Sequence, residues 1–160
     1  LKEMGYNKDI YDQELTNPEQ VLELKAQDII LPKCEDAPEL GSDKILYNIS
    51  LFIDELLDSF YNIKKFYNLK HEADLVGHLV VALAPHTSAG IVGRIIGFSK
   101  TQGFFAHPLF HAATRRDCDG DEASVTLLMD ALLNFSRQFL PDSRGSTQDA
   151  PLVITSILIP

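Results

Sequence analysis

Three aspartates near residue 120 have the spacing that could support chemistry. Asp117, Asp119 and Asp121 alternate along the chain, and in extended or looped backbone a period of two directs their carboxylates to one side. Three unpaired anions repel one another unless a divalent cation neutralises them. Carboxylate oxygens favour a hard cation, so the pattern predicts a Mg²⁺ site that holds one or two ions.

A site of this kind suits metal-assisted phosphoryl transfer. A bound ion polarises the phosphoryl group, and a pair of ions about 3.5 to 4 Å apart can hold both the attacking and the leaving oxygen. Gly120, which has no Cβ, lets the chain turn tightly or lets a phosphate come close. Arg115 and Arg116 adjoin the aspartates and are candidate phosphate contacts.

A helix cap is the alternative interpretation of the same acids. Asp121 and Glu122 precede a helix expected from Ala123, where anionic side chains would meet free N–H groups. A calcium EF-hand loop is excluded, because counting from Asp117 puts Glu122 at the sixth position instead of Gly, and Leu128 at the twelfth instead of Glu. The third aspartate and the adjoining arginines favour a metal site over the cap.

A second candidate phosphate site lies upstream. His86, Thr87 and Ser88 place hydroxyls and free amides at the start of a helix expected over 89–97, which suits an anion. Arg94 within that helix could add a positive charge. The segment is not a P-loop, because no Gly-Lys-Ser/Thr follows its glycines, and close packing through the glycines explains them equally well.

Two histidines, His107 and His111, lie four residues apart on one face of a short expected helix. With Cys118 nearby they resemble part of a transition-metal site, but zinc would require further ligands of this type. We interpret both histidines as structural residues, with His107 capping the helix that Pro108 opens.

The chain is acidic overall, and its charge is unevenly distributed. The formal net charge of −9 argues against a nucleic-acid partner, which normally meets a basic surface. Residues 1–43, however, hold 11 acids and 4 bases, whereas residues 86–116 hold no acid and four bases. A phosphate could therefore approach the latter part of the chain.

The hydrophobic pattern predicts an α+β fold of short elements. We divide the chain into an acidic N-terminal segment, residues 1–41, with a short helix and a strand, and a segment of residues 42–160 that carries the aspartates. Helices are expected from Pro18, from Ser42 to about Ile63, over 89–97, from Pro108 to about Arg115 and over 123–139, and strands over 29–32, 79–85, 104–106 and 152–160.

Composition narrows the class of protein. At 160 residues and 45% hydrophobic, the chain can form one globular domain with a core. It has two distant cysteines, no signal-peptide pattern and no apolar run of bilayer length, so we expect a soluble cytoplasmic protein without a membrane partner. Because it begins at Leu1 and stops in a β-rich apolar stretch, we expect a fragment of a longer protein.

Four blocks of this sequence resemble the large catalytic subunit of the archaeal D-family DNA polymerases, also called DNA polymerase II. They occur in the same order as in that family and together span nearly the whole chain. They are residues 21–28, 75–98, 107–122, which include the three aspartates, and 132–155.

The resemblance implies a DNA-directed DNA polymerase whose core contains two double-psi β-barrels, with this chain supplying part of the second barrel and its helical insertions. By position, Asp119 and Asp121 correspond to the family's catalytic, metal-binding aspartates. Asp117 lies where we expect the family to have Asn. Arg115 and Arg116 would hold phosphates of the DNA or of the triphosphate.

The same resemblance implies several partners and a cellular location. They are template–primer DNA, deoxynucleoside triphosphates, the remainder of the large subunit, a small exonuclease subunit and the sliding clamp, in the cytoplasm at the nucleoid. Two other functions stay open: a non-catalytic DNA-binding or scaffold module whose aspartates only cap a helix, and a metal-dependent phosphodiesterase that acts alone.

Overall fold

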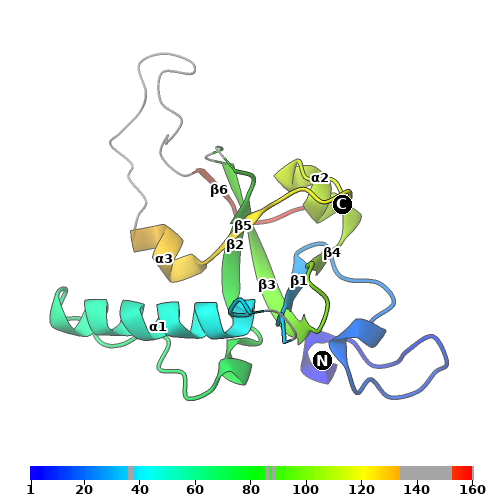
Figure 1. Ribbon diagram of the computed structural model, residues 1–160, viewed down its shortest axis with the longest axis horizontal. Helices are drawn as coiled ribbons and strands as arrows, with labels where there is room; N and C mark the ends of the chain where they lie inside the picture. The colour runs from blue at the N-terminus through cyan, green and yellow to red at the C-terminus, as the bar shows by residue number, and fades with distance from the viewer. Residues whose placement is uncertain (36–37, 86, 88, 134–152, 160) are drawn as a thin grey trace, which may run out of the picture.

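The computed structural model describes residues 1–35, 38–85, 87, 89–133 and 153–159 (Figure 1). Within these ranges, six strands form one mixed sheet accompanied by three α-helices, so the expected mixture of helices and strands is confirmed. The elements are β1 (Asp28–Pro32), α1 (Ser42–Ser59), β2 (Leu79–Leu83), β3 (Ala89–Ser99), β4 (Phe105–Ala106), α2 (Pro108–Thr114), β5 (Ser124–Leu127), α3 (Leu128–Leu133) and β6 (Val153–Thr155), with 3-10 turns at Lys2–Met4, Pro18–Gln20 and Glu72–Leu75.

Strand β3 is the centre of the sheet, because three other strands pair with it. The sheet order is β4-β1-β3-β2-β5, and β6 also pairs with β3. Along one edge of β3, residues 94–99 pair with β1 and residues 89–91 pair with β6, both in parallel. The opposite edge pairs with β2 in the antiparallel direction. Every other part of the sheet is therefore placed relative to β3.

The helix expected over 89–97 is wrong, since these residues belong to β3. Ile91, Val92, Ile95 and Ile96 are each no more than 8% exposed, because side chains cover both faces of the strand. A strand buried on both faces has a nearly continuous apolar run, without the alternation that identifies a half-exposed strand. A spacing of four residues, as between Ile91 and Ile95, also returns to the same face in both a helix and a strand.

The helix expected over 123–139 is also wrong at its start. Ser124–Leu127 form β5, which pairs with β2 in the antiparallel direction, and only then does α3 begin at Leu128. The β-branched Val125 and Thr126 favour a strand, but a run of four residues is too short to reveal its period. Residues 134–139 of this expected helix lie outside the described residues.

Other elements agree with the sequence. Strands β1 and β2 and helices α1 and α2 are confirmed, and β4 and β6 occur within the segments expected for them. Helix α1 ends at Ser59, so the last expected apolar positions, Phe60 and Ile63, lie beyond it and are exposed. The helix expected from Pro18 is a single 3-10 turn, in which the Asn17 side chain accepts a hydrogen bond from the Glu19 amide.

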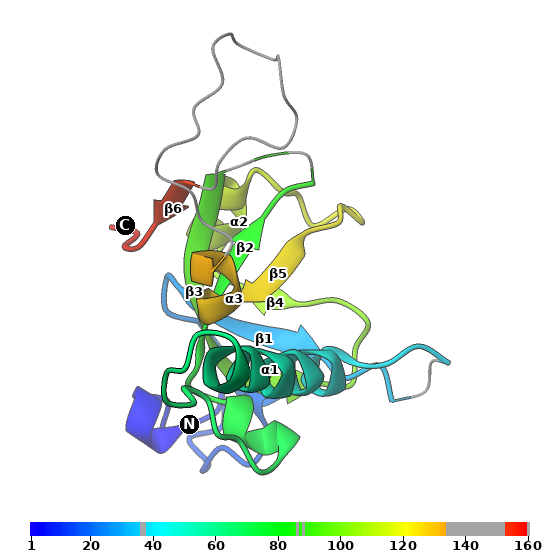
Figure 2. The same cartoon turned by 90° about the vertical axis from the view of Figure 1, so that its left-hand side faces the viewer.

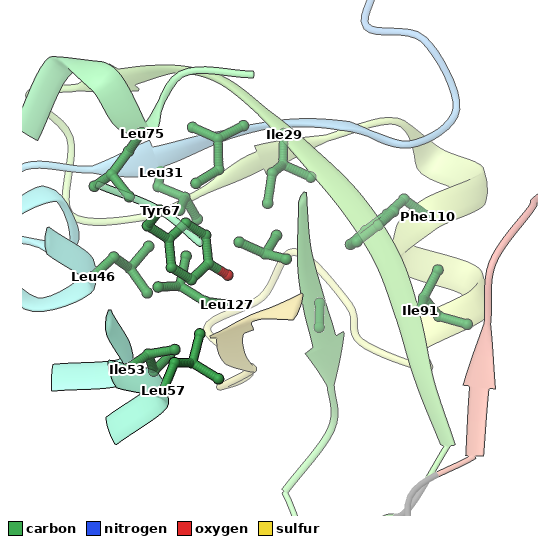
Figure 3. Packing of buried hydrophobic residues seen from close by; sticks show 13 residues of the cluster. Ile29, Leu31, Leu46, Ile53, Leu57, Tyr67, Leu75, Ile91, Phe110 and Leu127 are labelled. Carbon is green, nitrogen blue, oxygen red and sulfur yellow. The ribbon is translucent and has the colours of Figure 1, made fainter. Parts of the chain in front are cut away.

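The main core lies between α1 and the sheet (Figure 3). Burying a large apolar side chain contributes about 1.5 to 3 kcal/mol to stability, so this cluster fixes α1 firmly on the strands. In Figures 1 and 2, α1 lies at one end of the sheet and α2 lies towards the other end. The labelled members of the cluster are Ile29, Leu31, Leu46, Ile53, Leu57, Tyr67, Leu75, Ile91, Phe110 and Leu127.

No helix within the described residues combines the length and the apolar character that a membrane span requires.

A buried carboxylate fixes the chain that follows α1. Asp54 is 4% exposed and accepts hydrogen bonds from the backbone amides of Phe66 at 3.1 Å, Tyr67 at 2.8 Å and Asn68 at 2.6 Å. A buried carboxylate is strongly unfavourable unless it is hydrogen-bonded. These three amides satisfy it and tie residues 66–68 to the middle of the helix.

We expect Asp54→Ala to release this segment. Hydrogen bonds to a charged group contribute about 1.5 to 3 kcal/mol, so amide hydrogen exchange at residues 66–68 should become about 30-fold faster. The control is Asp58→Ala, which removes an exposed acid from the same helix. Unchanged exchange at residues 66–68 in Asp54→Ala would show that the carboxylate does not hold the segment.

Candidate metal centre

Helix α2 leads directly into the aspartates, and local interactions define both of its ends. The His107 ring nitrogen Nδ1 accepts a hydrogen bond from the Leu109 amide at 3.0 Å, and Pro108 occupies the first turn, so the predicted capping role of His107 is confirmed. Arg115 ends the helix in the left-handed region, with φ 58° and ψ 39°, and its amide donates to the carbonyl oxygen of Ala112.

The packing of Phe110 on Gly93 holds α2 against β3. Phe110 is fully buried, and a Cβ added to Gly93 would lie 3.2 Å from its ring and 3.4 Å from the carbonyl oxygen of Gln27. Only a residue without a side chain lets the helix approach the central strand this closely. Close packing through this glycine was one explanation that the sequence offered, although Gly93 was expected in a helix and lies in strand β3.

The segment between α2 and β5 gathers the three carboxylates. Asp117, Asp119 and Asp121 are exposed, and each offers one oxygen such that all three oxygens lie within 4.8 Å of one another. Gly120 has φ 109° with nothing within 4 Å of the place of a Cβ, so the backbone conformation, and not lack of space, favours glycine there. The Asp117 amide also donates to Oδ2 of Asp121 at 3.2 Å.

This donor set fits a hard divalent cation. All three groups are carboxylates, which suit Mg²⁺ better than a softer metal. An ion that binds oxygen at about 2.1 Å joins oxygens up to about 4.2 Å apart. Exposed side chains can close the small remaining difference by rotation. The arrangement can therefore hold a cation without a change in the fold.

The helix-cap interpretation of these acids is wrong. Asp121 and Glu122 are followed by strand β5 and not by a helix, so no array of free helical amides faces them. The non-catalytic scaffold hypothesis depended on that cap and loses its support from this segment.

The two arginines differ in how they meet the aspartates. Arg116 donates from Nε to the carbonyl oxygen of Arg115 at 2.8 Å, and its Nη1 lies 3.8 Å from Oδ2 of Asp121. Arg115 is exposed, whereas Arg116 is partly buried. Arg116 therefore faces the carboxylates, while Arg115 is the more accessible to a phosphate.

A pocket of about 1210 Å³ adjoins the aspartates, between the start of α1, β4 and α2. Arg116, Asp117 and Asp121 line it together with the rings of Phe104 and His111, whose centroids are 5.4 Å apart. Burial lowers the pKa of His111, so its imidazole is neutral at pH 7. Sequence reasoning missed this pocket and the place of His111 in it, because segments distant in the sequence build it.

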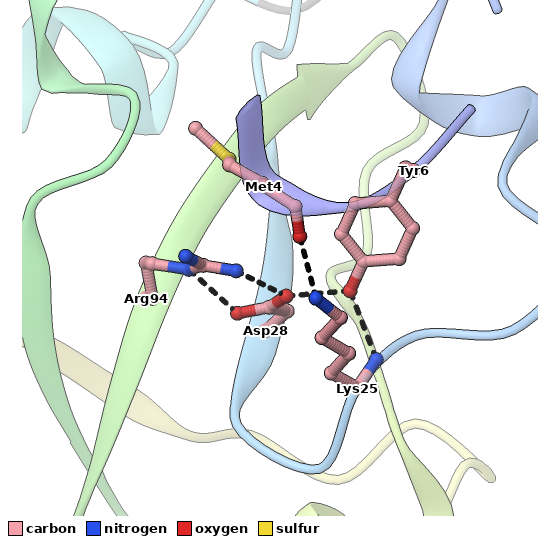
Figure 4. Close-up of polar contacts among 5 residues, drawn as sticks. All are labelled: Met4, Tyr6, Lys25, Asp28 and Arg94. Carbon is pink, nitrogen blue, oxygen red and sulfur yellow. Dashed lines mark hydrogen bonds and ion pairs between the residues drawn. The ribbon is translucent and has the colours of Figure 1, made fainter. Parts of the chain in front are cut away.

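Arg94 lies in a different environment, inside a polar network between β1 and β3 (Figure 4). Its guanidinium donates to both oxygens of Asp28, at 2.8 and 2.7 Å, which raises the pKa of Arg94. The Tyr6 hydroxyl donates to the same carboxylate at 2.5 Å and accepts from the Lys25 amide. Because Asp28 already pairs with Arg94, the predicted phosphate contact of Arg94 gains no support.

The second candidate phosphate site, at residues 86–88, was predicted because a helix was expected to begin there, and that helix is absent, since residues 89–97 lie in strand β3. No helix begins at residue 89, so the free helical amides expected there do not exist. The Thr87 hydroxyl donates to the carbonyl oxygen of Ala84 at 2.7 Å. His86 and Ser88 lie outside the described residues, and their predicted phosphate contacts stay predictions.

Comparisons with known proteins agree on one family. A family model described as the catalytic domain of the DNA polymerase II large subunit DP2 matches residues 1–160. The chain is 56% identical over 160 residues to the DNA polymerase II large subunits of Pyrococcus furiosus and Archaeoglobus fulgidus, and 54% identical over 161 residues to that of Methanococcus maripaludis strain C7. Each alignment covers the whole chain, but only 12%, 13% and 14% of these three relatives, respectively.

We expect Gly93→Ala to disturb the approach of α2 to β3. The added methyl group would press on the ring of Phe110, and overpacking of this kind costs about 1 to 3 kcal/mol. Amides of α2 should then exchange hydrogen about tenfold faster or more. Gly103→Ala is the matched control, because nothing lies within 4 Å of the place of its Cβ; equal exchange in the two variants would contradict the packing argument.

Proposed function

This chain belongs to the family of DNA polymerase II large subunits, as part of their catalytic domain, and from that premise we propose that it supplies the metal-binding aspartates of a DNA-directed DNA polymerase. The observation that carries the proposal is the exposed cluster of three carboxylates with oxygens within 4.8 Å of one another. The chain spans at most 14% of the length of these relatives. We therefore assign the activity to the whole subunit, and expect no polymerisation by this chain alone.

Each residue of the loop has a separate task in this proposal. When bound, Mg²⁺ activates the primer 3′-hydroxyl and neutralises charge that develops on the triphosphate. Asp119 and Asp121 provide the principal ligand oxygens, and Asp117 adds a third. Arg116 orients the Asp121 carboxylate from the side. Catalysis then depends mainly on positioning and on charge neutralisation.

The proposed substrates are template–primer DNA and deoxynucleoside triphosphates. Arg115 is the proposed phosphate contact, because its side chain is exposed beside the aspartates. The proposed partners are the remainder of the large subunit, the small exonuclease subunit and the sliding clamp. This role implies a cytoplasmic, nucleoid-associated location.

We further propose that the sheet forms part of the second of two double-psi β-barrels, with the helices as insertions. Its support is the mixed pairing of β3, parallel to β1 and β6 and antiparallel to β2. The division into residues 1–41 and 42–160 stays a proposal about composition. It does not describe separate packing, because β1 from the first part pairs with β3 from the second.

We expect Asp119→Asn and Asp121→Asn to abolish primer extension by the complete large subunit with its small subunit. Loss of several kcal/mol of charge stabilisation, at tenfold in rate per 1.4 kcal/mol, predicts a decrease of about a thousandfold, with DNA binding unchanged. The matched control is Asp58→Asn, which removes an exposed acid of α1 outside the aspartate loop, and we expect it to extend primers as the unsubstituted enzyme does.

The comparison is made at several Mg²⁺ concentrations, with DNA affinity measured in parallel. Normal extension by both Asp119→Asn and Asp121→Asn would show that the loop does not hold the catalytic ions. Loss of DNA binding together with extension would assign these residues to folding or DNA contact instead.

A further inference from the structure

The segment that follows α1 combines exposed aromatic side chains with lysines. Phe60 is 72% exposed, Tyr61 is 45% exposed and Phe66 is 58% exposed. Residues 60–71 contain no Asp or Glu, although the chain as a whole has a net charge of −9. The segment has no part in the proposed catalysis. Its lysines are Lys64, Lys65 and Lys70.

Residues 60–71 have a defined conformation. The Asp54 carboxylate holds the amides of residues 66–68, and the Ile63 amide donates to the carbonyl oxygen of Leu57 at 2.8 Å. Asn62 and Asn68 both adopt a left-handed backbone, with φ 53° and 47°, and asparagine tolerates that region better than most residues. The fold therefore fixes the backbone that carries these exposed aromatic rings.

Among the described residues, the ring contacts of this segment's exposed side chains are with neighbouring rings, Phe60 with Tyr61 and Phe66 with Tyr67. None of the salt bridges among the described residues includes Lys64, Lys65 or Lys70. Phe60 and Tyr61 contact each other edge to face, with centroids 5.0 Å apart, but both are exposed. A cluster of exposed large apolar side chains marks a surface that binds something.

The charge of the segment identifies the chemistry of its partner. Aromatic rings stack on unpaired bases, and lysines neutralise the phosphates between them; together they form the usual surface for a single strand. We propose that residues 60–71 bind the unpaired template strand of DNA. This inference rests on the proposed polymerase function only in that the enzyme must have an unpaired template strand nearby.

Helix α1 sets the separation between this segment and the aspartates (Figure 1). Its first turn contributes Ser42, Ile45 and Leu46 to the pocket beside the carboxylates. Residues 60–63 follow its last turn, whereas Asp54 holds residues 66–68 beside the middle of the helix. With 18 residues and 1.5 Å of rise per residue, the helix is about 27 Å long. The rise from Ser42 to Asp54 is about 18 Å, so at about 3.4 Å per stacked nucleotide the contacts lie about five to eight nucleotides from the pocket.

The test measures binding of primer–templates to the complete large subunit with its small subunit. One DNA has a template overhang of 4 nucleotides, which is too short to reach residues 60–71, and the other has an overhang of 20 nucleotides, which can reach them. We expect the pair Phe60→Ala and Phe66→Ala, combined, to weaken binding about tenfold on the long overhang and to leave the short one unchanged. A 5-iododeoxyuridine placed about five to eight nucleotides into the overhang should cross-link to residues 60–71.

The contribution of the lysines is tested by the salt dependence of DNA binding. Lys64→Gln with Lys65→Gln should weaken binding on the long overhang and reduce the slope of log K against log salt by about 1.4, since each single-strand phosphate contact contributes about 0.7. The aromatic variants should leave that slope unchanged. Matched controls are Phe52→Ala, which removes an exposed ring on α1, and Lys8→Gln, which removes a lysine paired with Asp12.

Three outcomes would overturn the proposal. Unchanged affinity on the long overhang would mean that no single strand binds here. An equal loss on both overhangs would indicate duplex contact or damage to the fold, and loss of assembly with the small subunit would assign the surface to a protein. Failure of the catalytic proposal looks different, because Asp119→Asn and Asp121→Asn would then extend primers normally. The variants of residues 60–71 should extend normally at saturating DNA whichever result those two give.

Discussion

The contact between Phe110 and Gly93 is the constraint on which the position of the aspartates depends. It holds α2 against β3, the strand to which β1, β2 and β6 are all hydrogen-bonded. The aspartate loop begins where α2 ends and finishes at β5, which is fixed to β2. Both ends of the loop are therefore tied to the centre of the sheet. A loop tied in this way can be exposed to a ligand and still keep its three carboxylates together.

The buried acids Asp28 and Asp54 and the aspartates of the loop differ in how their oxygens are satisfied. Asp28 is buried and has both oxygens paired with Arg94, and buried Asp54 accepts from three amides. The aspartates of the loop instead lie at the surface, and among the residues that the structure describes Asp121 meets only one amide and an arginine nitrogen at 3.8 Å. The hydrogen bonds to Asp28 and Asp54 offset the cost of burying their carboxylates. Exposed, converging ones leave oxygen atoms for a cation, which is the physical basis of the proposed function.

The sequence predicted the features that depend on local chemistry and missed those that depend on packing. The aspartate triplet, the capping role of His107 and the amphipathic pattern of α1 could be recognised because neighbouring residues determine them. Strand β3 was mistaken for a helix because its burial on both faces depends on distant segments, and because a four-residue spacing suits either structure. The pocket beside His111 could not be predicted, since α1, β4 and α2 each supply part of its wall.

Helix α1 connects the two surfaces that carry the proposals. Leu46, Ile53 and Leu57 on its buried face are no more than 5% exposed, so the helix cannot shift along the sheet without opening the main core. Its first turn therefore stays beside the aspartate pocket, while its last turn holds residues 60–63 and Asp54 holds residues 66–68 at fixed distances from that pocket. Because α1 is rigid, one template strand can contact both the aspartate loop and residues 60–71 only if the number of nucleotides between the two contacts is fixed. The core that stabilises the fold thus also determines how much template can lie between the two contacts.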